Sequence, residues 1–87
     1  MMTPIVLRVH DFNFGWSAHD AGEPAHVHVY RQGDRNSSAK FWLKKNSVEL
    51  AHNNARFSEK ELSQTKEIIM YNRDFFIARW FDFFNAD

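Results

Sequence analysis

Cysteine is absent from this 87-residue chain. Secreted domains of this size commonly depend on disulfides, so we expect a protein of a reducing compartment, the cytoplasm. Long hydrophobic runs are absent too. Ile5-Val6-Leu7 is followed at once by Arg8, which leaves an apolar stretch too short for a signal-peptide core or a membrane span, so no membrane association is expected. Neither sign of charge is in excess, because eleven Lys and Arg residues balance eleven Asp and Glu residues. A general attraction to nucleic acid therefore has no support from net charge.

Large apolar side chains are plentiful. Hydrophobic residues make up 44% of the chain, and they include nine Phe, three Trp and two Tyr. A chain of this length is just long enough for one self-sufficient hydrophobic core, which bulky aromatic rings can fill without disulfide support. We therefore expect a single domain over residues 1–87.

The first half of the chain alternates between apolar and polar residues, as strands do. Such patterns cover residues 5–9, 25–31, 39–43 and 48–51. The aromatic residues Phe12, Phe14 and Trp16 are in the opposite phase to Ile5, Leu7 and Val9. A bulge or tight turn near residues 10–11 is needed if both sets face one core. The sequence thus predicts strands within residues 4–53.

A helix is predicted over residues 59–84. Ser58 and Glu61 match the capping-box pattern, and Phe57 and Leu62 suit a hydrophobic staple. Apolar residues then recur with helical spacing, and Asn72 is a point at which the helix would kink or split. The expected fold class is α+β, a small antiparallel sheet of three to four strands packed against a long C-terminal helix.

The end of this helix carries more apolar surface than one core needs. Its aromatic and aliphatic residues between 76 and 84 spread over about 160° of the helix surface, wider than the roughly 100° stripe that covers a core. Either the helix end is wedged between parts of its own domain, or it contacts a second copy or a protein partner. In the second case the interface residues are Trp80, Phe81 and Phe84.

Residues that can bind a metal or transfer protons lie close to Pro24 in the sequence. His26 and His28 are two apart on a predicted strand, so both imidazoles project from one face. The preceding loop holds His19, Asp20 and Glu23, candidate further ligands for zinc or another divalent metal. Two other interpretations remain open. The pair is an ordinary polar strand face, or His26 and His28 act without metal as catalytic acid and base on a phosphodiester.

The same strand face suits RNA. If Val27, Val29, Phe41 and Leu43 point at the helix, the opposite face combines imidazoles with aromatic and cationic groups. Single-stranded RNA is bound in this way, because bases stack on rings while Lys neutralises phosphate. The nucleic-acid or phosphate contacts expected here are Tyr30, Lys40, Trp42 and Lys44. Alternatively, Trp42 completes a core or a dimer contact.

The chain resembles a known family. The run Glu23-Pro-Ala-His-Val-His-Val-Tyr30, with Ala39-Lys-Phe-Trp-Leu43, Val48-Glu-Leu-Ala51, Phe57-Ser58 and the helix bearing Trp80, is similar to the small bacterial domain-of-unknown-function family four-one-six-zero. Members usually have a second proline directly before the first histidine, where this chain has Ala25. The resemblance implies membership of a two-gene toxin–antitoxin-like pair, without an established reaction.

Two functions follow as hypotheses. The first is an interaction module that binds a partner or itself through the aromatic helix end. The second is a nuclease-like toxin acting on RNA, in which the histidines bind metal or act as acid and base while Lys40 and Lys44 hold phosphate. Whether the protein is an enzyme stays open at this point.

Overall fold

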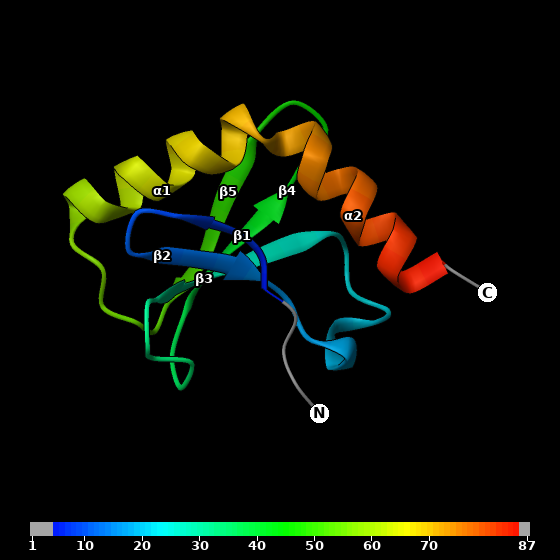
Figure 1. The fold of residues 1–87 in the computed structure, drawn as a ribbon. Helices are drawn as coiled ribbons and strands as arrows, with labels where there is room; N and C mark the ends of the chain where they lie inside the picture. Colours follow the sequence, from blue (N-terminus) through cyan, green and yellow to red (C-terminus); the bar gives the residue numbers. More distant parts are fainter. Residues whose placement is uncertain (1–4, 86–87) are drawn as a thin grey trace.

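The computed structural model describes residues 5–85, which form a five-stranded antiparallel sheet followed by two helices (Figure 1). The strands are β1 (Ile5–Val9), β2 (Phe12–Gly15), β3 (His26–Arg31), β4 (Ala39–Leu43) and β5 (Val48–Asn53), and they pair in sequence order. The α+β prediction is confirmed, but the sheet has one strand more than the three or four expected. The predicted phase slip accounts for the extra strand, since it separates β1 from β2.

The turn between β1 and β2 is the one that the aromatic pattern required. Val9 pairs with Phe12, so only His10 and Asp11 lie between the strands. His10 has a φ of 55°, a left-handed conformation that reverses the chain in a short hairpin. As a result Phe12 and Phe14 fall on the core side of the sheet, where both are buried.

The C-terminal half contains α1 (Glu59–Tyr71) and α2 (Arg73–Asn85) rather than one helix. The start is as predicted, because Ser58 and Glu61 each hydrogen-bond the other residue's backbone N–H. At Asn72 the helix bends. The Ile68 carbonyl accepts both the backbone N–H and the side-chain amide of Asn72, at 3.1 and 2.9 Å. The second hydrogen bond to this carbonyl perturbs the regular helical hydrogen bonding, and the helix changes direction at Asn72, the position that the sequence indicated.

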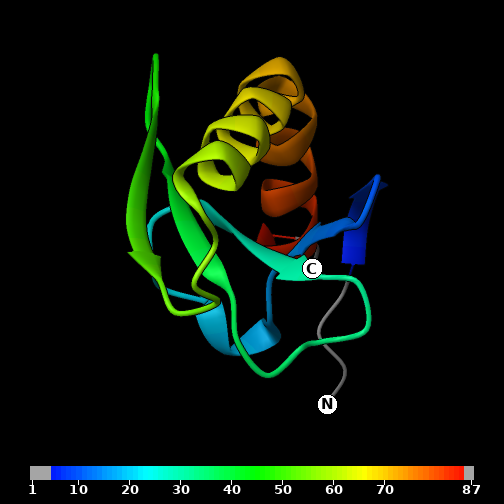
Figure 2. The same cartoon turned by 90° about the vertical axis from the view of Figure 1, so that its left-hand side faces the viewer.

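Both helices lie against the concave face of the curved sheet (Figure 2). Val27, Val29, Phe41 and Leu43 are buried on this face, as predicted. Aromatic pairs connect the sheet to the helical half of the chain, with ring centroids 5.6 Å apart for Phe12–Phe57, 5.8 Å for Phe14–Phe76 and 5.3 Å for Trp16–Trp80. No helix within residues 5–85 has the length and apolar character needed to cross a membrane.

Trp80 belongs to this core and not to an interface. It was an interface candidate in one of the two alternatives, but only 4% of its surface is exposed, because the Trp16 ring packs against it. The helix end is therefore wedged inside its own domain at Trp80. Phe81 is 52% exposed and Phe84 is partly buried against the core, so a partner contact at Phe81 stays a prediction.

Candidate metal centre

The centre joins the start of β3 to the 3₁₀ turn Ala18–Asp20 that precedes it. Ser17 caps this turn. Its hydroxyl accepts the His19 backbone N–H at 3.2 Å, and its own backbone N–H donates to Asp20 Oδ2 at 2.9 Å. These two bonds hold the Asp20 carboxylate against the strand that bears the histidines.

Two imidazole nitrogens converge on one carboxylate oxygen. Asp20 Oδ2 lies 3.2 Å from His26 Nε2 and 3.5 Å from His28 Nε2. The ligand atoms of the three residues all lie within 4.8 Å of one another. The His26 side chain is fully buried, while those of Asp20 and His28 are 15% and 16% exposed. The centre is thus enclosed on the His26 side and reaches solvent beside the other two residues.

Each ring is anchored through its other nitrogen. His26 Nδ1 lies 2.9 Å from the Pro24 carbonyl oxygen, which can only accept, so Nδ1 carries a proton. His28 Nδ1 lies 2.9 Å from the hydroxyl of buried Ser38. Histidine ligands of metals are oriented in this way, by hydrogen bonds from the ring nitrogen that does not bind the metal.

His26 Nε2 has no hydrogen-bond partner among the described residues although it is buried. In a neutral His26 protonated at Nδ1, the Nε2 lone pair faces the Asp20 oxygen. Two acceptors at this distance repel unless a proton or a cation lies between them. The arrangement can therefore hold a shared proton or a metal ion.

The electrostatics favour metal-binding protonation states. Burial lowers the pKa of His28 to about 4, although the Asp20 carboxylate acts in the opposite direction. Burial also raises the pKa of Asp20, but the Ser17 N–H and the two imidazoles outweigh it, and the net pKa is lowered. At neutral pH His28 is uncharged and Asp20 is ionised, as metal ligands must be.

The distances fit a tetrahedral ion. With metal–ligand bonds of about 2.0–2.1 Å, two ligand atoms of a tetrahedron are separated by about 3.3–3.4 Å. The two separations from Asp20 Oδ2, 3.2 and 3.5 Å, lie on either side of this value, and the two imidazole nitrogens lie within 4.8 Å of each other. Asp20, His26 and His28 could hold a metal, and a tetrahedron would keep a fourth position for water.

The other two predicted ligands lie outside this cluster. His19 neighbours Asp20 in sequence, but it is exposed and is not among the converging groups. Glu23 Oε1 is 3.8 Å from His26 Nδ1, the nitrogen bound to Pro24, and is therefore on the wrong side of the ring. Its carboxylate instead binds Lys40 Nζ at 2.7 Å, and this hydrogen bond lowers the pKa of Glu23.

Three of the four predicted nucleic-acid contacts adjoin the centre. Lys40 pairs with His28 across the strands, and its Nζ lies 4.2 Å from the centroid of the Trp42 ring. Tyr30 is 6.0 Å from His28, centroid to centroid, but it is only 7% exposed, so little of its ring could stack on a base. Trp42 is partly exposed on this polar face and does not complete the core. Lys44 follows β4 in the turn to β5, apart from the cluster.

Sequence reasoning missed two neighbours of the centre. His52 on β5 pairs with Lys40, which places its ring 6.2 Å from that of His28, and burial lowers the pKa of His52. The β4–β5 hairpin pattern could have indicated this position, had the register been followed across it. Ser38 lies in a polar connection, and nothing in the sequence marks it as the partner of His28.

Comparison with known proteins gives one match. No curated protein and no solved structure matches the chain. A family model described as "Domain of unknown function (DUF4160)" matches residues 12–81, which include Asp20, His26 and His28. The resemblance carried by the Pro-x-His-x-His motif is thereby confirmed, and the chain belongs to the DUF4160 family.

Proposed function

We propose that this chain is a metal-dependent toxin that cleaves RNA, with a divalent ion such as zinc held by Asp20, His26 and His28. The observation that carries the proposal is the convergence of two anchored Nε2 atoms on Asp20 Oδ2 at 3.2 and 3.5 Å. Two imidazoles, one carboxylate and a water form the ligand set of many hydrolytic zinc sites.

The chemistry follows from the fourth ligand. A zinc-bound water has a pKa of about 7, so it supplies hydroxide at neutral pH. An ion held by Asp20, His26 and His28 would activate a water for attack on the phosphorus of a phosphodiester, with the leaving sugar oxygen taking a proton from water. Lys40 lies beside the centre and would provide positive charge for the phosphate on exchanging its ion pair with Glu23. The partly exposed Trp42 ring offers a surface for a base.

A mechanism based on the histidines alone has weaker support. A general acid or base works best when its pKa is near the operating pH. Burial keeps the pKa of His28 at about 4, so this ring is almost never protonated at neutral pH and cannot serve as the acid. A metal ion removes this difficulty, because it needs the unprotonated ring.

Metal analysis and a chelation assay test the proposal together. Protein purified in zinc-containing buffer should hold about one ion per chain, and His28→Ala should hold much less. Cleavage of single-stranded RNA should stop with chelator and return with zinc. Wild-type protein without bound metal would refute the metal centre, and metal without RNA cleavage would refute the reaction.

An interaction module is the second candidate. It is favoured by three aromatic side chains of α2 that stay exposed, Phe75 at 40%, Phe81 at 52% and Phe83 at 43%. Large apolar groups exposed on one helix offer contacts to a partner or a second copy. Such a contact is compatible with a metal centre, since toxins of two-gene pairs bind their partners.

A further inference from the structure

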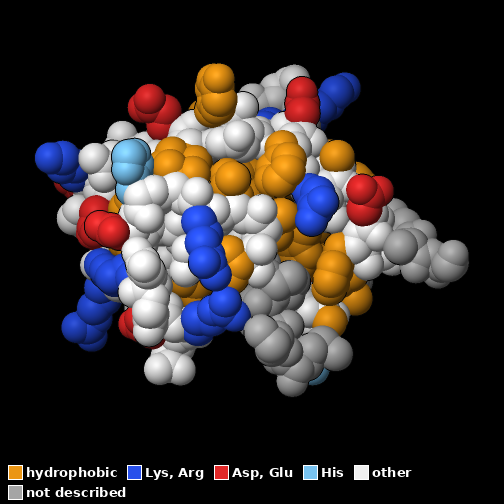
Figure 3. Space-filling view, in the orientation of Figure 1, with side chains coloured by type: hydrophobic (Ala, Val, Ile, Leu, Met, Phe, Trp, Pro, Cys, Tyr) orange, Lys and Arg blue, Asp and Glu red, His pale blue; other side chains and the backbone are white. Residues whose placement is uncertain are grey.

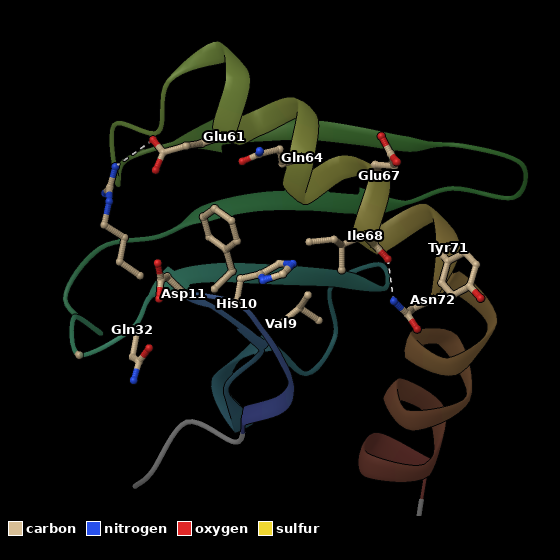
Figure 4. Close-up of a pocket in the computed structure, with 13 residues that line it drawn as sticks. Val9, His10, Asp11, Gln32, Glu61, Gln64, Glu67, Ile68, Tyr71 and Asn72 are labelled. Carbon is tan, nitrogen blue, oxygen red and sulfur yellow. Dashed lines mark hydrogen bonds and ion pairs between the residues drawn. The ribbon is translucent and has the colours of Figure 1, made fainter.

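A groove of about 1390 Å³ runs between α1 and the hairpin turn of β1 and β2, apart from the metal centre. One wall is formed by five residues spaced along one side of α1, namely Glu61, Gln64, Glu67, Ile68 and Tyr71. Figure 4 shows Val9, His10 and Asp11 across the groove from this helix. Hydrophobic side chains gather in the middle of the same face of the molecule (Figure 3). The groove is therefore an apolar trough bounded by a helix and a hairpin.

The rim of the groove carries excess negative charge. Asp11, Glu61 and Glu67 line it, against Arg31 as the one Lys or Arg among the described lining residues. Arg31 is already engaged, because it approaches Glu61 within 3.4 Å and its guanidinium stacks on the ring of Phe57. Among residues 5–85 no cation is paired with Asp11 or Glu67. A cationic ligand would supply the missing charges.

The dimensions fit a helix. The stretch of α1 from Glu61 to Tyr71 is about 15 Å long at 1.5 Å per residue. The groove volume of about 1390 Å³ leaves room for a second element along this stretch of α1. An α-helix of three turns matches the length of this wall.

We propose that this groove binds an amphipathic basic helix of a partner protein, about three turns long. Its apolar side chains cover the partly exposed Val9 and Ile68, and its Lys or Arg side chains lie beside Asp11 and Glu67. Helices bind grooves in this way through residues spaced three and four apart. The acidic rim excludes RNA from this face, so the groove and the polar sheet face of the metal centre serve different ligands.

A designed helix is a suitable probe. A fluorescein-labelled peptide of about twelve residues, with Leu on one face and Lys on the other, is titrated with the full chain and followed by fluorescence anisotropy. The wild-type protein should bind it, and the same peptide with Glu in place of Lys should bind at least about tenfold more weakly. Amide shifts in NMR spectra should concentrate at Gln64, Glu67 and Tyr71.

Matched variants distinguish peptide binding in the groove from nonspecific electrostatic attraction to the protein. Glu67→Lys should weaken binding of the Lys peptide at least about fivefold, whereas Asp82→Lys, the same charge change at an exposed site on α2, should alter it less than about twofold. Zinc content should be unchanged in both variants, which distinguishes this result from failure of the metal centre. Equal losses, no binding by wild type, or amide shifts centred on α2 would overturn the proposal. So would a dimer that dissociates on Gln64→Arg, because it would assign the groove to a second copy.

Discussion

Zinc should stabilise the folded chain, and replacement of one imidazole should remove a defined part of that effect. For a dissociation constant near 1 μM, about 100 μM free zinc adds about 2.7 kcal/mol to the free energy of unfolding. In a domain of this size each kcal/mol shifts the melting temperature by about 4–8 °C, so zinc should raise it by roughly 10–20 °C. His28→Ala removes a nitrogen 3.5 Å from Asp20 Oδ2 and should weaken zinc binding at least about tenfold. The zinc-dependent shift should then fall by about 6–11 °C.

Thermal unfolding can be followed by intrinsic fluorescence, because Trp42 and Trp80 both contact the His26 ring, at centroid distances of 5.4 and 4.8 Å. Each variant is measured with and without zinc, so its own change in stability cancels. His52→Ala is the matched control, because this ring lies on the same sheet face but outside the converging cluster. A wild type that does not respond to zinc, or equal reductions in His28→Ala and His52→Ala, would refute the assigned ligands.

Three further outcomes are expected. The pKa of His28 is about 4 in the folded chain and about 6.5 when unfolded, so the unfolded chain binds the proton more readily. The free energy of unfolding should therefore be highest above pH 6.5 and decrease as the pH falls, by about 2–3 kcal/mol at pH 4.5. Urea unfolding of the metal-free protein measures this decrease, which should be smaller in His28→Ala. Phe81→Glu should lower the oligomeric state in light scattering with helix content unchanged, and a monomeric wild type would exclude self-association. Ile69→Ala should cost about 2–5 kcal/mol in the same urea assay, because this side chain is fully buried, and a loss below about 1 kcal/mol would contradict its place in the core.

Local patterns predicted those parts of the fold that depend on neighbouring residues. Strict alternation in β3 assigned Val27 and Val29 to the core, where both are fully buried. The capping box at Ser58 and Glu61 marked the start of α1, because its two hydrogen bonds join residues three apart. The strand number was less accessible, since it depended on whether the segments before and after His10 formed one bulged strand or two.

The composition of the candidate site could be predicted only in part from local sequence patterns. The sequence indicated His26 and His28 together with three loop residues, and it gave no means of choosing among His19, Asp20 and Glu23. That choice is made by the Ser17 cap, which holds the Asp20 carboxylate against β3, and by Lys40 on the neighbouring strand, which binds the Glu23 carboxylate. The choice between burial and an interface for Trp80 stayed open for a similar reason. Its partner Trp16 is distant in the sequence, and no helical pattern can predict that contact.

The burial of His26 distinguishes a built centre from an ordinary polar strand face. On an ordinary polar face the imidazole would be solvated, and water would satisfy both ring nitrogens. His26 instead has no exposed surface, and the rings of Trp42 and Trp80 pack against it. Its Nε2 faces a carboxylate oxygen at 3.2 Å with no hydrogen bond to it. A chain of 87 residues has little stability to spare, and a buried acceptor without a donor costs about 1–3 kcal/mol. A shared proton or a cation between these two atoms would remove that cost, so the burial of His26 supports a cluster that could hold a metal.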